Sequence, residues 1–139
     1  MGKSVIKREL QIEARTENLD ELLDVLREDM EKMGCPVDKQ TAVEICAEEI
    51  FVNIASYAYG ESTGDAYVWE EVGENGITVC FRDKGVPYNP LEKEDPDTSL
   101  TAEERQIGGL GIFMVKNMMD AVSYEYKEGA NCLTMMMAW

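Results

Sequence analysis

The sequence predicts a two-layer α/β sandwich, in which a mixed, mostly antiparallel sheet of about five strands carries three helices on one face. Three segments have the apolar spacing of helices, and five have the alternation or the β-branched and aromatic content of strands. Four of those strands fall into two hairpins. A length of 139 residues suits a single core, so we expect residues 1–139 to form one domain.

The first two predicted elements are an edge strand and a helix. Residues 4–13 alternate apolar with charged side chains, which is typical of a strand with one buried face. Asn18, followed by Glu21 three residues later, gives a helix start of the capping-box type. Apolar residues continue at helical spacing from there until Gly34, which ends the predicted helix.

A second helix and a hairpin follow. Asp38 is expected to cap a longer helix that Gly60 ends, and a broad apolar stripe runs between them. Residues 65–72 and 77–83 are rich in Tyr, Val, Trp, Ile and Phe. The turn residues 73–76 between these segments, Gly-Glu-Asn-Gly, predict an antiparallel hairpin.

The last part of the sequence predicts a long loop, a third helix and a second hairpin. Residues 84–107 contain three prolines, many acids and few large apolar side chains, so they are expected to form a loop that acts as a lid. Residues 110–119 are apolar at helical spacing and follow a run of glycines. Residues 121–127 and 131–138 are expected to pair around the turn at 128–130.

The amino-acid composition limits the binding partners and the chemistry to consider. The net charge of −15 argues against binding to nucleic acid or to an anionic membrane, and it leaves open whether the acids serve solubility or a basic partner. The chain has no histidine, so acid–base chemistry falls to carboxylates, and the four widely spaced cysteines are expected to be reduced. No secretory signal and no membrane-length apolar run is present, which predicts a cytoplasmic location.

Two pairs of polar and glycine residues stand out. Glu49 and Asn53 are four residues apart, so a helix places them on one face, where the amide oxygen suits Mg²⁺ and the carboxylate suits a proton acceptor. Asp83 ends a strand, and Gly85 lets the backbone approach a ligand while Asp83 accepts a hydrogen bond from an amine such as adenine N6. Alone, the first pair is more typical of a solvated helix face and the second of a turn.

A glycine-rich segment comes directly before the third helix. Gly108, Gly109 and Gly111 would expose backbone amides at the positive end of the helix dipole, where a phosphate group binds well. The spacing is neither that of a P-loop nor that of a dinucleotide fingerprint. Arg105, just upstream, is either a further phosphate contact or an exposed surface arginine.

Together these segments resemble the three boxes of the GHKL (Bergerat-fold) ATPases. Glu49-x-x-x-Asn53 resembles the N box, Asp83-x-Gly85-x-Pro87 the first glycine box, and Gly-Gly-Leu-Gly at 108–111 the second glycine box. The residues that flank these boxes are similar to those of the bacterial anti-sigma-factor serine/threonine kinases, although Pro-Tyr-Asn-Pro at 87–90 departs from the Pro-Phe-Asp-Pro that is common there.

The resemblance implies the Bergerat fold, with ATP and Mg²⁺ as cofactors. It implies a kinase that phosphorylates a serine or threonine of a STAS-type anti-sigma-factor antagonist, sequesters a sigma factor and forms a homodimer. By position, Glu49 is the implied general base, Asn53 the Mg²⁺ ligand, and Asp83 and Gly85 the adenine contacts. The implied phosphate contacts, under the lid of residues 84–107, are Arg105, Gly108, Gly109, Leu110 and Gly111.

Three other interpretations stay open at this point. The chain is alternatively a nucleotide-dependent protein-binding module of the same fold without kinase activity. The ATPase half of a histidine kinase is disfavoured because both the phosphoacceptor histidine and the dimerisation helices are missing. A small α/β domain with no ligand is the fourth interpretation.

Overall fold

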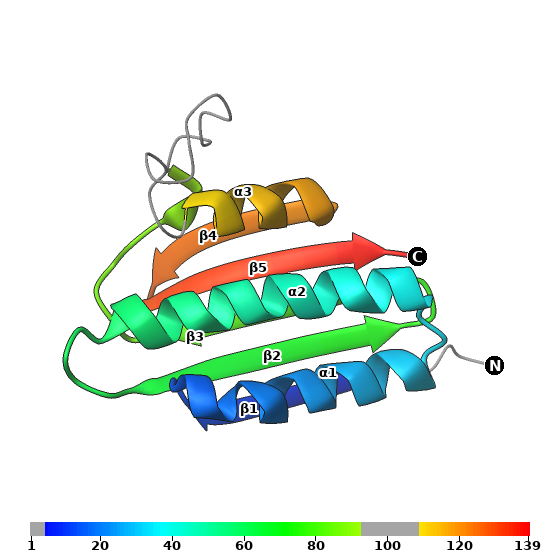
Figure 1. The fold of residues 1–139 in the computed structure, drawn as a ribbon, viewed down its shortest axis with the longest axis horizontal. Helices are drawn as coiled ribbons and strands as arrows, with labels where there is room; N and C mark the ends of the chain where they lie inside the picture. The colour runs from blue at the N-terminus through cyan, green and yellow to red at the C-terminus, as the bar shows by residue number, and fades with distance from the viewer. Residues whose placement is uncertain (1–4, 93–108) are drawn as a thin grey trace.

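A computed structural model describes residues 5–92 and 109–139 of the chain. Its architecture is the predicted two-layer α/β sandwich (Figure 1). The helices are α1 (Leu19–Lys32), α2 (Val37–Asn53) and α3 (Gly109–Met118). The strands are β1 (Ile6–Glu13), β2 (Asp65–Gly73), β3 (Gly76–Asp83), β4 (Ala121–Lys127) and β5 (Ala130–Ala138).

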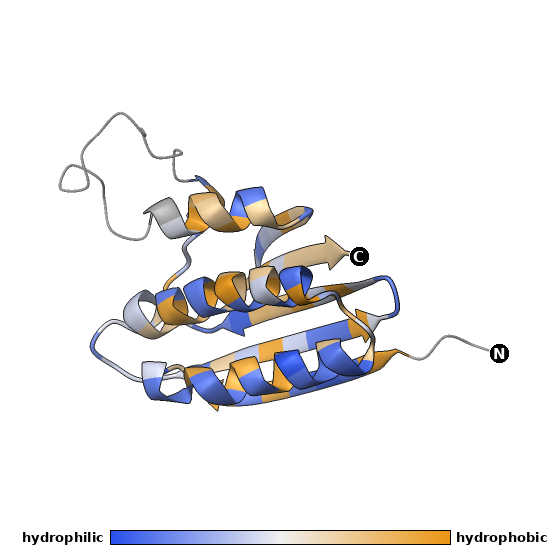
Figure 2. Cartoon of the chain, turned by 45° about the vertical axis from the view of Figure 1, so that its right-hand side comes forward, coloured by the Kyte–Doolittle hydropathy of each residue, from blue (hydrophilic) through white to orange (hydrophobic). Residues whose placement is uncertain are grey.

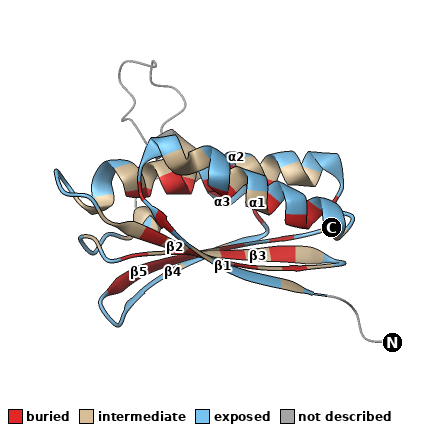
Figure 3. Ribbon diagram, turned by 90° about the horizontal axis from the view of Figure 1, so that it is seen from below, coloured by how far each residue is buried: buried red, intermediate tan, exposed pale blue. Residues whose placement is uncertain are grey.

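The five strands form one sheet in the order β1-β2-β3-β5-β4, and every neighbouring pair is antiparallel. Strand β1 lies at an edge, as predicted, and Gly73 pairs with Gly76 across the predicted hairpin turn. All three helices cover the same face of the sheet (Figure 3). The sandwich therefore has a single interior, between the helices and that face.

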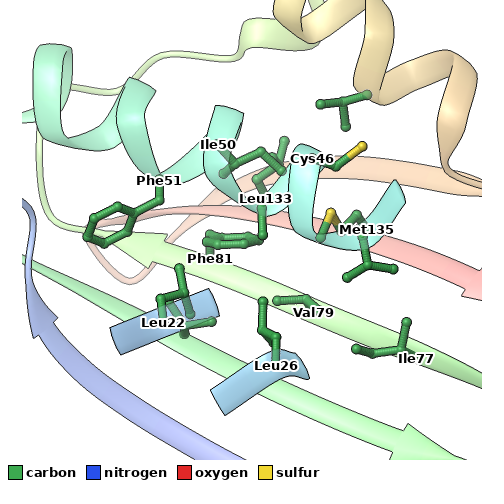
Figure 4. Packing of buried hydrophobic residues seen from close by; sticks show 14 of the residues in the cluster. Leu22, Leu26, Cys46, Ile50, Phe51, Ile77, Val79, Phe81, Leu133 and Met135 are labelled. Carbon is green, nitrogen blue, oxygen red and sulfur yellow. The ribbon is translucent and has the colours of Figure 1, made fainter. Parts of the chain in front are cut away.

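The core fills this interior because the apolar stripe of each helix meets every second residue of the strands. In Figure 2 the helices carry both hydrophilic and hydrophobic residues along their length. Figure 4 shows Leu22 of α1 and Phe51 of α2 near Phe81 of β3, and Cys46 of α2 beside Met135 of β5, and all five side chains are buried. Burying each large apolar side chain contributes roughly 1.5–3 kcal/mol, so this layer is the main source of stability.

Of the two predicted helix caps, Asn18 takes the N-cap position of α1 without a side-chain capping bond, and Asp38 is not a cap. Asn18 does precede α1, but its amide donates to the Glu13 carbonyl at 2.9 Å and makes no capping bond, because the chain enters through a short 3₁₀ turn at Thr16–Asn18. Asp38 is the second residue of α2. The helix begins at Val37, because Pro36 at the N-cap position has an extended ψ of 146°.

The end of the second helix also differs from the prediction. Helix α2 ends at Asn53 and continues as a π-helical turn over Ile54–Ala58, whereas Gly60, with a φ of +59°, comes after this turn. A π turn inserts an extra residue into the helical repeat and is often found at functional sites. Here it shifts the side chains after Asn53 relative to an uninterrupted α-helix.

All four cysteines are free, in agreement with the expectation of reduced thiols. Burial raises the pKa of Cys35 and of Cys46 to about 11, so these thiols stay protonated and unreactive at neutral pH. In residues 5–92 and 109–139, none of the helices combines the length and the apolar character that crossing a membrane requires.

Candidate functional site

A cavity of about 480 Å³ lies between the end of α2, its π turn, the end of β3 and the segment that follows β3. Its apolar lining includes Ile50, Ile54, Phe81, Ile112 and Leu133. Its polar lining includes Asn53, Asp83, Asn131 and the tyrosines Tyr57, Tyr88 and Tyr124. A mostly apolar cleft of this volume with a few polar groups is typical of a small-molecule site.

Glu49 and Asn53 lie one turn apart on α2, close enough for the Asn53 side chain to lower the pKa of the Glu49 carboxylate. Asn53 lines the cavity, whereas Glu49 is not among its lining residues and is half-buried beside it. Burial raises the pKa of Glu49, the charge of Glu48 raises it further, and the Asn53 side chain partly offsets both. A carboxylate with a raised pKa is a better proton acceptor than a free one.

Gly111 brings α3 close to the same carboxylate. Gly111 lies in the first turn of α3, and a Cβ at this position would overlap the carboxylate of Glu49. The glycine therefore allows the N-terminal turn of α3 to approach Glu49. The first backbone amides of a helix have no partner within it, so this turn offers donors beside the carboxylate.

The second glycine box is only partly described. Gly109 and Leu110 open α3, as the sequence predicts for a helix start near 110. Arg105, Gly108 and the lid residues 93–107 lie outside the described residues. Their predicted contacts with phosphate stay predictions.

Asp83 is the last residue of β3 and is buried on the helix-facing side of the sheet. Its Oδ1 accepts hydrogen bonds from the Gly85 amide at 3.0 Å and from the Asn131 side-chain amide at 2.9 Å. Both of these bonds use the same oxygen. Oδ2 is therefore the carboxylate oxygen available to a ligand in the cavity.

Gly85 is needed for a close backbone approach. A Cβ there would overlap the carbonyl of Ala58 in the π turn, and the next amide, that of Val86, donates to this carbonyl at 2.9 Å. The segment after β3 is thus fastened to the end of the second helix. This contact forms one wall of the cavity, because Ala58 and Val86 both line it.

Tyr59, which follows the π turn, also holds the start of the segment after β3 in place. Its hydroxyl donates to the carbonyl of Asp65 and accepts from the Lys84 amide at 3.0 Å. Burial is the main reason that the pKa of Tyr59 is raised, so the hydroxyl stays protonated and can donate. Gly64 lies against the Tyr59 ring, where a Cβ would overlap it.

Sequence reasoning missed Asn131 and Tyr124, although both line the cavity and belong to the polar network of Asp83. The Asn131 carbonyl oxygen accepts from the Tyr124 hydroxyl, and its amide donates to Asp83. The available signal was the alternation of the last strand. It places Asn131 on the same side as the apolar Leu133 and Met135, where a polar residue needs a buried partner.

Within the described part of the chain, no three His, Cys, Asp or Glu side chains gather closely enough to hold a metal ion. A cation in this cavity would therefore take its ligands from an amide such as that of Asn53, from water and from a bound phosphate chain. That donor set suits Mg²⁺, which keeps several waters and prefers oxygen ligands.

Comparisons with known proteins point to one family. The profile of the histidine kinase-like ATPase domain matches residues 12–137. The chain is 27% identical over 92 residues to the serine/threonine-protein kinase BtrW of Bordetella bronchiseptica, which covers 66% of the chain and 65% of BtrW. It is 28% identical over 106 residues to the serine-protein kinase RsbW of Bacillus thuringiensis and of Bacillus cereus, covering 73% of the chain and 66% of RsbW. The matched part is thus just under two thirds of these relatives' length.

Proposed function

The chain belongs to the histidine kinase-like ATPase domain family, and from this premise we propose that it is an ATP-dependent protein serine/threonine kinase. The resemblance of its three boxes to the GHKL ATPases, and to the anti-sigma-factor kinases among them, is confirmed by the family match and by relatives named as serine kinases. The proposed substrates are Mg-ATP and a serine or threonine of a STAS-type anti-sigma-factor antagonist.

One observation carries the proposal: a single cavity is lined by Asn53 and Asp83, and the loop at Gly85 and the first turn of α3 both adjoin it. These groups come from segments far apart in the sequence. Their convergence is what a nucleotide site requires, since base, metal and phosphates must be held at once. The volume of about 480 Å³ is within the range of small-molecule sites.

The base would lie in the apolar part of the cavity. Ile50, Phe81 and Leu133 supply apolar walls, and Asp83 Oδ2 would accept a hydrogen bond from the exocyclic amine of adenine. A buried carboxylate binds a ligand that donates a hydrogen bond to it more tightly than a ligand that places an oxygen against it. This arrangement favours adenine over purines that carry a carbonyl group at the same position.

The phosphate chain would run from this cavity toward α3. Asn53 would hold Mg²⁺, which when bound neutralises charge on the phosphate oxygens. The amides at Gly109, Leu110 and Gly111 would bind phosphate oxygens at the start of the helix, in the manner general to helix N-termini. Arg105 and Gly108 are proposed as further contacts.

Glu49 would act as the general base. The hydroxyl oxygen of the substrate forms a bond to the γ-phosphorus, its proton passes to the Glu49 carboxylate, and the bond to ADP breaks. The raised pKa of Glu49 suits this role because the carboxylate holds the proton more readily than an ordinary glutamate does. Asn53, whose side chain lies close to the same carboxylate, would orient it.

The biological setting is proposed on the same grounds. The chain would act in the cytoplasm, bind a sigma factor when its antagonist is phosphorylated, and form a homodimer. A direct nucleic-acid partner and a membrane partner are not proposed, given the net charge of −15.

The test is a phosphotransfer assay with ATP labelled at the γ-phosphate and purified STAS antagonists. The wild-type chain should leave phosphoserine or phosphothreonine on one antagonist. Glu49→Gln should bind ATP but lose transfer by ~10²-fold or more, the size expected for a general base. Glu21→Gln is the matched control, since Glu21 is exposed on α1, from which no residue lines the cavity. ATP binding without any transfer would favour the alternative of a protein-binding module, and no ATP binding would overturn the proposal.

A further inference from the structure

Asn131 is a buried polar residue in an apolar row. It lies near the start of β5, is 7% exposed, and pairs directly with Asp83 of the neighbouring strand β3. The following residues on the same side of β5, Leu133 and Met135, are apolar core residues. Burying an amide at such a position costs free energy unless all its donors and acceptors find partners.

Each hydrogen-bonding position of the Asn131 side chain is filled. Its nitrogen donates to Asp83 Oδ1 at 2.9 Å and to the Val86 carbonyl at 3.0 Å. Its oxygen accepts from the Tyr88 backbone amide at 3.0 Å and from the Tyr124 hydroxyl. One side chain thus joins β3, the segment after β3, β4 and β5.

The orientation of this amide is fixed by its surroundings. Asp83 Oδ1 and the Val86 carbonyl only accept, so the nitrogen must face them, and the Tyr88 amide only donates, so the oxygen must face it. The Tyr124 hydroxyl completes the second side, because burial raises its pKa and keeps it protonated. A side chain with two donors and two acceptors in a plane is required here, and asparagine is the shortest one.

The bonds of Asn131 have two consequences for the cavity. The first is that Asp83 Oδ1 is saturated by two donors, which stops the carboxylate from rotating and leaves Oδ2 as the free acceptor. The second is that the backbone of residues 86–88 is held at two points, so the wall formed by Val86 and Tyr88 has a defined position.

We propose that Asn131 is a positioning residue for base recognition, which orients the Asp83 carboxylate and the segment after β3 so that the site distinguishes an amine from a carbonyl oxygen on the bound purine. The inference rests on the proposed function, since it assigns selectivity to the same cavity. It predicts that selectivity between bases, and not only stability, depends on a residue that need not touch the nucleotide.

The test compares the binding of Mg-ADP and Mg-IDP by isothermal titration calorimetry. Inosine carries a carbonyl oxygen where adenine carries its amine, so the ratio of the two dissociation constants reports on Asp83. The variants are Asn131→Leu, which removes all four bonds, and Asn131→Asp, which keeps the shape but puts a carboxyl group against Asp83 in place of a donor. Asn18→Asp is the matched control, since Asn18 donates to a backbone carbonyl in β1, away from the cavity.

The wild-type chain and Asn18→Asp should prefer ADP by about 10-fold or more, the size expected for a hydrogen bond to a charged group. Both Asn131 variants should lose about 10-fold of this preference. The measurement is made at a temperature well below the unfolding midpoint of each variant, so that the protein is folded. A folded Asn131 variant that keeps the wild-type ratio would overturn the inference. Loss of folding in both variants would also overturn it, by making Asn131 a purely structural residue. A wild-type chain that binds neither nucleotide would instead refute the proposed function.

Discussion

Replacement of the buried Glu70 is predicted to change how the stability of the chain depends on pH. Glu70 lies in β2 under α1, is 2% exposed, and has the fully buried Asp29 beside it. Arg8 forms a bidentate pair with Asp29 at 2.8 and 3.0 Å but lies 3.9 Å from the nearest Glu70 oxygen. Two carboxyl groups thus lie beside one guanidinium, and Asp29 makes the closer contact with it.

The protonation of the two carboxyl groups follows from this geometry. Burial raises the pKa of Glu70 to about 9, and the neighbouring Asp29 charge adds to the effect. Burial also opposes ionisation of Asp29, but hydrogen bonds from Glu70 and Arg8 and the charge of Arg8 outweigh it and lower the pKa of Asp29. At neutral pH Glu70 is therefore neutral and donates to an ionised Asp29. As an ion, Glu70 would have no donor partner among the described residues.

The sign of the pH dependence is set by the raised pKa. The unfolded chain releases the Glu70 proton near its ordinary pKa of 4.5, whereas the folded chain keeps it up to about pH 9. The stabilisation is therefore complete below pH 4.5 and is lost as the pH rises toward 9, with a slope of about 1 kcal/mol per pH unit. Asp29 contributes in the opposite sense and only in acid, where stability falls as the pH drops through its lowered pKa.

The assay is urea unfolding of Glu70→Gln and the wild type at intervals between pH 5 and pH 9. The glutamine keeps a donor toward Asp29 and does not titrate, so the free energy of unfolding of the variant should change less over this range. The stability difference should move in favour of the variant as the pH rises. Glu71→Gln, on the opposite side of β2 and paired with Lys7 at 3.5 Å, is the control and should follow the wild type. Parallel curves for Glu70→Gln and wild type would refute the assignment of a neutral Glu70.

Three further predictions concern the cavity. Gly85→Ala should lower the free energy of unfolding by about 1–3 kcal/mol and weaken nucleotide binding, because the new Cβ overlaps the Ala58 carbonyl. Gly73→Ala, whose Cβ meets open space, is the control, and equal unfolding midpoints for the two variants would contradict the prediction. Asn53→Ala should remove most of the Mg²⁺ dependence of ADP affinity, measured by calorimetry with the metal and with a chelator. The pH profile of phosphotransfer should fall on the acid side through a raised Glu49 pKa, and a profile midpoint at or below the ordinary glutamate value would count against a Glu49 base.

The elements could be predicted from the sequence because their signals are local. Apolar periodicity, together with β-branched and aromatic content, predicted the three helices and the five strands, and the Gly-Glu-Asn-Gly turn predicted the β2–β3 hairpin. The helix ends were harder to predict. Asn18 and Asp38 have the chemistry of caps, but Asn18 bonds to the end of β1 and Asp38 comes after a proline that already sets the helix start.

The candidate site was predictable only in part. The spacing of Glu49 and Asn53 fixes their common face on any helix, and both residues lie on α2. Their roles toward a ligand stay predictions. Asn131 carries no such pattern, because three of its four partners, Tyr88, Val86 and Asp83, are 43 to 48 residues away in sequence and become neighbours only through the pairing of β3 with β5. Nor does the sequence indicate the π turn, which brings Ala58 against Gly85.

The central claim is that one cavity binds an adenine nucleotide with its metal ion, and a crystal structure of the chain with Mg²⁺ and a non-hydrolysable ATP analogue tests it most directly. The account predicts the adenine amine within about 3 Å of Asp83 Oδ2 and Mg²⁺ bound to the Asn53 amide oxygen, with Glu49 facing the γ-phosphate. A nucleotide bound elsewhere, or bound in this cavity with its base away from Asp83, would contradict it.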